Sequence, residues 1–108
     1  MAAMHITKEN FEQQVIRSDK PVLLDFWAPW CTYCRRISQA YDRIAAEYEG
    51  LLIAAKVNID EEAELARMEE IEVVPTLVIY QNGQALGSIV APQSKAEIDS
   101  FIKESLGW

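Results

Sequence analysis

The chain has 108 residues, of which 10 are basic and 17 acidic, so its formal net charge at pH 7 is −7. This length fits one domain, residues 1–108, with a hydrophobic core of its own. The charge argues against nucleic acid or an anionic membrane surface as the main partner, and no apolar run approaches the roughly 18 residues that a membrane helix needs.

Hydrophobic periodicity predicts an alternation of helices and strands along the chain. In chain order the expected elements are a short strand at 4–6, a helix over 7–17, a strand over 22–27, a helix from Cys34 to about Gly50, a strand over 51–57, an acidic helix over 61–70, strands over 76–80 and 84–90, and a last helix over 94–106.

Local signals mark several ends of these elements. Thr7 and Asp60 are the expected N-caps of two helices, the Asn-Gly pair at 82–83 is a strong hairpin turn, and residues 94–97 have the pattern of a capping box. Strands separated by helices pair in parallel through right-handed crossovers, and the hairpin adds an antiparallel pair. The sequence therefore predicts an α/β fold, with a central mixed sheet of about four or five strands flanked by about four helices on both faces.

The chain has two cysteines, Cys31 and Cys34, which can pair only with each other. A disulfide between them closes so short a loop that it removes little entropy from the unfolded chain. The pair lies where the strand over 22–27 gives way to a helix, and there unpaired N–H groups and the helix dipole stabilise a thiolate. Functional sites also gather at the carboxyl ends of parallel strands. The position of the pair therefore indicates chemistry rather than structural support.

Half of a zinc site is the main alternative interpretation of two cysteines at this spacing. Zinc usually takes four Cys or His ligands, and the chain offers only His5 besides the two cysteines, so a site within one chain would need a carboxylate. We favour a redox dithiol because the motif adjoins a βαβ pattern, and we expect no metal. A metal that bridges two chains stays open as an alternative.

Asp25 interrupts an otherwise apolar strand, six residues before Cys31. Burial should raise the pKa of its carboxyl group, so that it could accept or donate a proton near neutral pH. Lys56 has a comparable position in the strand over 51–57, and the two side chains could face each other across neighbouring strands. The alternative is that both point to solvent at strand ends; we favour a functional role.

Pro75 precedes the strand over 76–80 and has two interpretations. It either starts the strand or forms a cis peptide bond that holds backbone groups open to a partner, and the residues alone do not choose between them. Trp27 and Trp30 flank the dithiol, where they could pack the site or form a contact surface; Trp27 fits the core better.

With these features in place, the chain resembles thioredoxin along nearly its whole length. The landmarks that carry the resemblance are Asp25-Phe26-Trp27-Ala28, Trp30-Cys31-x-x-Cys34, Ala55-Lys56-Val57-Asn58-Ile59-Asp60, Val74-Pro75-Thr76-Leu77 and Asn82-Gly83. The resemblance implies a thioredoxin fold and protein dithiol–disulfide exchange, with no cofactor beyond the redox-active pair Cys31–Cys34.

The resemblance also implies a role for each site residue. Cys31 would be the attacking thiolate, Cys34 the resolving thiol, and Asp25 a buried proton acceptor coupled to Lys56. Pro75 would be cis. The residues expected to contact a substrate are Trp30, Thr32, Tyr33, Val74, Pro75 and Ala91. The expected partners are protein disulfides and a reductase or other thiol electron donor, and the chain is expected to be a monomer.

Three positions depart from the thioredoxin pattern. Thr32-Tyr33 stands where the family has Gly-Pro, Gln39 stands where it has a helix proline, and Ala91 stands where it has a glycine. We expect a less kinked helix and a dithiol that is less reducing than that of ordinary thioredoxin. A tyrosine before the second cysteine is also found in glutaredoxins and certain isomerases.

Two further functions compete with a disulfide reductase. One is a disulfide oxidase or isomerase of an exported compartment, and the other is a non-catalytic or metal-bridged binding module on the same fold. Residues 1–6 lack the basic and apolar stretches of a secretory signal, so we expect a cytoplasmic protein. Removal of an upstream signal sequence would make it an exported one.

Overall fold

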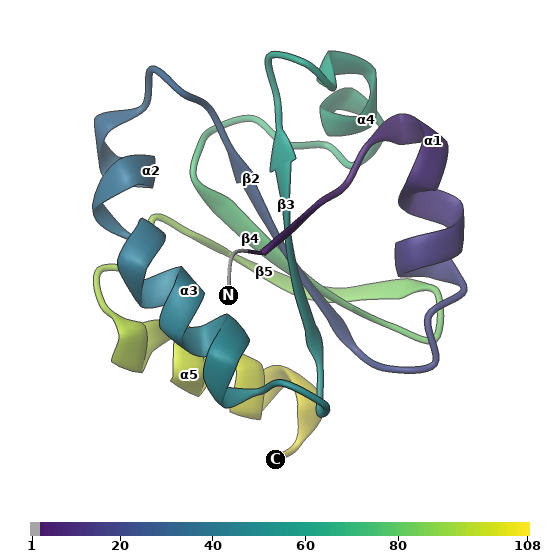
Figure 1. Cartoon of the computed structure of the whole chain (residues 1–108), viewed down its shortest axis with the longest axis vertical. Helices are drawn as coiled ribbons and strands as arrows, with labels where there is room; N and C mark the ends of the chain where they lie inside the picture. Colours follow the sequence, from purple (N-terminus) through teal and green to yellow (C-terminus); the bar gives the residue numbers. More distant parts are fainter. Residues whose placement is uncertain (1–2) are drawn as a thin grey trace.

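The computed structural model describes residues 3–108, so the first two residues of the expected domain and N-terminal segment lie outside the described residues. A five-stranded sheet with the order β1-β3-β2-β4-β5 has helices on both faces (Figure 1). Strands β1, β2 and β3 run parallel, while β4 is antiparallel to β2 and β5 to β4. This confirms the predicted mixed α/β sheet. The strands are β1 (Met4–His5), β2 (Val22–Trp27), β3 (Ile53–Asn58), β4 (Thr76–Gln81) and β5 (Gln84–Val90).

The helices lie in two layers, one on each side of the sheet. They are α1 (Lys8–Phe11), the π-helix η1 (Glu12–Ile16), α2 (Thr32–Arg36), α3 (Ser38–Glu47), α4 (Ala63–Met68) and α5 (Lys95–Leu106). The helices α3 and α5 cover one face and α1, η1 and α4 the other. No helix of the described residues is long and apolar enough to cross a membrane.

Strand β2 supplies both hydrophobic cores because its side chains alternate between the faces. Leu23 packs with α3 and α5, whereas Val22, Leu24 and Phe26 pack with α1, η1 and α4. By the same alternation Asp25 lies on the face of Leu23, beneath α3. The burial of the strand on both faces, predicted from its apolar run, is confirmed.

A single helix was expected over 7–17, but the structure has an α-helix followed by a π-helix there. Thr7 caps it as predicted, in a capping box with Asn10, but after Phe11 the chain continues as a π-helix, in which Arg17 N–H donates to Glu12 O at 2.9 Å. Phe11 and Val15 are both buried. Their spacing is the same as in an α-helix, so the apolar pattern did not reveal the wider turn.

The prediction of Asp60 as the N-cap of a helix over 61–70 is wrong. The helix is α4, residues 63–68, and its N-cap, Glu62, makes no side-chain capping bond. Asn58 Oδ1 accepts the N–H groups of Asp60 and Glu61, so a turn precedes the helix. The Asp60 carboxylate instead accepts a hydrogen bond from Trp30.

The long helix predicted after Cys34 is divided at Ile37, whose ψ of −1° lies outside the α-helical range. The absence of a proline at Gln39 therefore does not keep this helix continuous. In the last helix Ser94 caps as predicted by accepting Glu97 N–H, but the Glu97 carboxylate accepts Gln93 N–H instead of closing the box on Ser94.

Tyr41 joins α3 to two neighbouring strands of the sheet. Its fully buried hydroxyl lies 2.9 Å from Leu23 O and 2.7 Å from Ala55 O. Tyr41→Phe should lower the free energy of unfolding by about 1–2 kcal/mol, because a buried hydrogen bond is lost. Urea denaturation measures this, with Tyr48→Phe at the partly buried bond to Asp99 as the control expected to lose less. Equal midpoints for Tyr41→Phe and the parent chain would contradict the assignment.

Candidate active site

Cys31 and Cys34 form a disulfide at the junction of β2 and α2, with a Cα–Cα distance of 5.2 Å. Cys31 is the N-cap of α2, and its Sγ accepts the backbone N–H of Cys34 at 3.1 Å. A tight turn places it there, because Cys31 N–H donates to Ala28 O at 3.2 Å. Arg35 Nη1 donates to Pro29 O at 2.7 Å and holds the turn against the helix. The backbone therefore directs a hydrogen-bond donor at the first sulfur.

Cys31 is the more exposed of the two cysteines, with 8% of its surface accessible against 4% for Cys34. Its Sγ lies 3.9 Å from Val74 O, and the Val74–Pro75 peptide bond is cis. Trp30 is 64% exposed beside it, with its indole N–H donating to Asp60 Oδ1 at 3.1 Å. An incoming disulfide would therefore reach Cys31 between the Trp30 ring and the Val74–Pro75 segment.

Hydrogen bonds join Tyr33 and Ala91, two of the remaining predicted contact residues, to the same surface. Tyr33 is half-buried, and its hydroxyl donates to Pro92 O at 3.2 Å. The N–H of Ala91 donates to Pro75 O at 2.9 Å, and Ala91 itself has a φ of 49°, in the left-handed region. Thr32 is exposed. The loop after β5, the loop before β4 and the residues between the cysteines thus form one connected surface.

Asp25 and Lys56 lie directly opposite each other on the parallel strands β2 and β3, as their positions in the sequence predicted. Asp25 is only 2% exposed, and its Oδ1 has no hydrogen-bond partner. Burial raises the pKa of this carboxyl from 3.8 to about 7, against the opposing effect of Lys56 and with a smaller contribution from Asp42. The alternative in which Asp25 points to solvent is therefore wrong.

Lys56 faces a cavity of about 290 Å³ that Trp27, Cys34, Arg35 and Ser38 also line. Its Nζ lies 3.4 Å from Ser38 Oγ and stands 5.9 Å from the centre of the Trp27 ring. The cavity therefore connects the second cysteine with the lysine that faces Asp25.

Four residues of the site were not predicted from the sequence: Ser38, Asp42, Tyr41 and Pro92. Ser38 and Asp42 follow Cys34 at intervals of four residues, so a polar face of the helix was a signal that could have revealed them. The helical spacing of apolar residues predicted only a core position for Tyr41. Nothing in the sequence indicated that the Pro92 carbonyl would accept a hydrogen bond from Tyr33. Within residues 3–108 no group of three or more His, Cys, Asp or Glu side chains is placed to hold a metal ion.

A disulfide-forming pair at the start of a helix, beside a buried carboxylate and the carboxyl end of a parallel strand, defines the class of dithiol–disulfide oxidoreductases. A family model described as Thioredoxin matches residues 2–104. Thioredoxin 1 of Nostoc sp. is 40% identical over 105 residues, which cover 97% of this chain and 98% of the relative.

Two further relatives are the thioredoxins of Porphyra purpurea, 36% identical over 96% of this chain and 97% of the relative, and of Haemophilus influenzae, 35% identical over 95% and 96%. The chain belongs to the thioredoxin family. It is a protein dithiol–disulfide oxidoreductase, and family membership fits protein disulfides as substrates and a reductase as electron donor.

Because its pKa is raised in the folded protein, Asp25 destabilises the fold when it is ionised. Folding favours the protonated form, so the penalty is absent below about pH 4, grows between pH 4 and 7, and is complete above pH 7. The free energy of unfolding of Asp25→Asn should therefore exceed that of the parent by about 2–4 kcal/mol at about pH 8. This difference should disappear below about pH 4. Urea denaturation of the oxidised proteins across pH measures it, and a gap independent of pH would contradict the raised pKa.

Proposed function

We propose that the chain acts as a reductant of protein disulfides, with Cys31 as the attacking thiolate and Cys34 as the resolving thiol. One observation carries this assignment: Cys31 Sγ, at the N-cap of α2, accepts the Cys34 N–H. A donor aimed at a sulfur stabilises its anion, and the thiolate is the form that attacks disulfides. Cys34 is less exposed and lies one helical turn away, which suits a thiol that reacts second.

The exchange takes two steps. In the first, the Cys31 thiolate attacks one sulfur of the substrate disulfide, a mixed disulfide forms, and the other substrate sulfur leaves as a thiolate that takes a proton. In the second, Cys34 loses its proton and attacks Cys31 Sγ, and the first substrate sulfur leaves. The substrate disulfide is thereby reduced to two thiols, and the protein dithiol is oxidised to the Cys31–Cys34 disulfide.

Asp25 is proposed as the acceptor of the Cys34 proton. A carboxylate with a pKa of about 7 can take up a proton and release it again near neutral pH. Lys56 supports this role in two ways: its charge opposes the effect of burial on Asp25, and it faces the cavity that Cys34 lines. The cavity would bring a proton from Cys34 to the neighbourhood of Lys56, whose strand position is opposite Asp25.

The substrate is proposed to lie across the surface that surrounds Cys31. The backbone of the half-buried Val74, whose carbonyl lies 3.9 Å from Cys31 Sγ, is proposed to pair with an extended substrate segment. Pro75 holds the loop, and the other proposed contacts are Trp30, Thr32, Tyr33 and Ala91.

The dithiol is proposed to be less reducing than that of thioredoxins with Gly-Pro between the cysteines. A proline has no N–H, whereas Tyr33 has one, so this chain has an additional backbone donor at the start of α2. Donors that stabilise the thiolate stabilise the reduced protein and raise its potential. The reductant direction requires a thiol donor and a compartment such as the cytoplasm that keeps thiols reduced. In an exported chain the same property would favour oxidation or isomerisation.

The two cysteines should differ in the effect of their loss. Cys31→Ser should lose all catalysis of disulfide reduction. In an insulin assay with dithiothreitol as donor, its rate should equal the uncatalysed rate. Cys34→Ser should still attack but should accumulate mixed disulfides, which mass spectrometry of the trapped adducts detects. Turnover by Cys31→Ser at the parent rate would contradict the assignment.

Equilibration with a glutathione buffer measures the potential of the pair. We expect a value above the roughly −270 mV of thioredoxin. Replacing Thr32-Tyr33 with Gly-Pro should lower it, which serves as the matched control. A parent potential at or below that value would contradict the proposal that this dithiol is less reducing. It would leave the proposed direction, reduction of the substrate, unchanged.

A further inference from the structure

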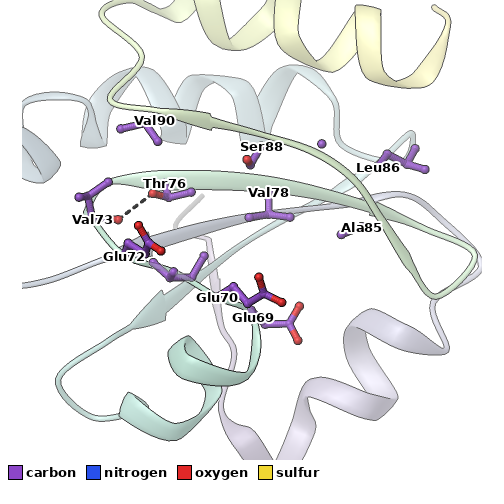
Figure 2. Close-up of a pocket in the computed structure, with 12 residues that line it drawn as sticks. Glu69, Glu70, Glu72, Val73, Thr76, Val78, Ala85, Leu86, Ser88 and Val90 are labelled. Atoms are coloured by element: carbon purple, nitrogen blue, oxygen red, sulfur yellow. Dashed lines mark hydrogen bonds between the residues drawn. The ribbon is translucent and has the colours of Figure 1, made fainter.

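A groove of about 410 Å³ lies on the face of the sheet that carries α1 and α4, between the loop before β4 and the strand β5 (Figure 2). Its floor consists of Thr76 and Val78 of β4 with Ser88 and Val90 of β5. Val90 is 54% exposed and Leu86, at the far end, 44%. Two large apolar side chains are thus exposed at the two ends of this stretch of β5, with the polar Ser88 between them.

One wall of this groove is acidic. Glu69, Glu70 and Glu72, from the loop between α4 and β4, stand along it (Figure 2). The Glu69 carboxylate accepts the Tyr80 hydroxyl at 2.6 Å and is fixed. Glu70 and Glu72 are exposed, and neither forms an ion pair with a basic side chain in the part of the chain that the structure describes. Their charges are available to a partner.

The groove adjoins a second cavity next to the active site, because Ile71, Glu72 and Val73 line both. This smaller cavity, of about 100 Å³, is also lined by Trp30, Ile59 and Val74. Val74 O lies 3.9 Å from Cys31 Sγ, and the loop is held in place because the Thr76 hydroxyl donates to Val73 O at 2.7 Å (Figure 2). A substrate chain attached through a sulfur at Cys31 therefore has to pass Val74 and the segment 71–73 to reach the groove.

We propose that this groove binds the segment of a protein substrate next to its reacting cysteine, and that it selects an extended segment in which basic side chains alternate with apolar ones. The distance along β5 from Val90 to Leu86 is about 13 Å, which about four extended residues span. Alternate side chains of such a segment face opposite ways, so apolar ones can meet the floor while lysine or arginine meets Glu70 and Glu72. The proposal rests on the reduction of protein disulfides proposed above.

Charge decides between the occupants of the groove. The chain carries a net charge of −7, so a second copy of it would bring acidic side chains to an acidic wall, and the two would repel. A neutral apolar segment would leave Glu70 and Glu72 without partners. A basic segment satisfies both the floor and the wall, and opposite charge also speeds its encounter with the protein.

Peptide disulfides test this directly. Each peptide carries one cysteine bonded to a chromogenic aromatic thiol, so attack of Cys31 on the peptide sulfur releases colour. The first peptide has lysines alternating with valines before the cysteine, and the second has the same residues after it. The third has glutamine in place of every lysine. Because the groove lies on one side of Cys31, the reduced protein should react about three to ten times faster with one of the lysine peptides than with the glutamine peptide at low salt. About 0.5 M salt should reduce this preference.

Glu70→Gln/Glu72→Gln should reduce the preference to less than twofold and leave the rate with the glutamine peptide unchanged. The matched control is Glu49→Gln/Glu104→Gln, which removes the same charge from exposed positions outside the groove and should keep the preference. Equal loss in both variants would show an effect of net charge and would overturn the proposal, as would the absence of any preference in the parent. Failure of the parent to react with the glutamine peptide would contradict the proposed function itself.

Discussion

The hydrogen bond from the Cys34 N–H to Cys31 Sγ is the interaction on which the function depends. It exists because Cys31 is the N-cap of α2, the position at which a helix has backbone donors without partners. Strand β2 carries the chain to this point from the middle of the sheet, and the turn over 28–31 directs the sulfur towards the helix. The two hydrophobic cores that hold β2 thus position one sulfur atom relative to one peptide group.

The burial of Asp25 is a second constraint, and it opposes stability. Its carboxyl lies in the layer between β2 and α3, where Lys56 faces it across the sheet but forms no direct ion pair with it among the described residues. A fold selected for stability alone would have an apolar residue there. The cost is the reason that the carboxyl titrates near neutral pH, so the same burial that weakens the fold gives the site its proton acceptor.

The sequence revealed much of this architecture because its strongest signals are local. The apolar run of β2, the Asn-Gly turn before β5 and the position of the cysteines between a strand and a helix all predicted what the structure has. The errors arose where tertiary contacts override local pattern. Asp60 has a side chain typical of an N-cap, but it accepts a hydrogen bond from Trp30 instead. The helix is divided at Ile37, where no proline in the sequence indicates a break. The link from Tyr33 to Pro92 joins residues 59 positions apart, and no spacing encodes it. The acidic wall of the groove was visible only as three glutamates near a helix end.

Disulfide reduction by this chain requires the protein to keep the Cys31 sulfur anionic at neutral pH. Titration of the reduced Cys34→Ser variant, followed by the ultraviolet absorbance of the thiolate, tests this most directly because only one thiol remains. We expect a midpoint clearly below the value of about 8.5 at which an ordinary cysteine titrates. A midpoint at or above that value would show that the start of α2 does not stabilise the anion, and it would contradict the account.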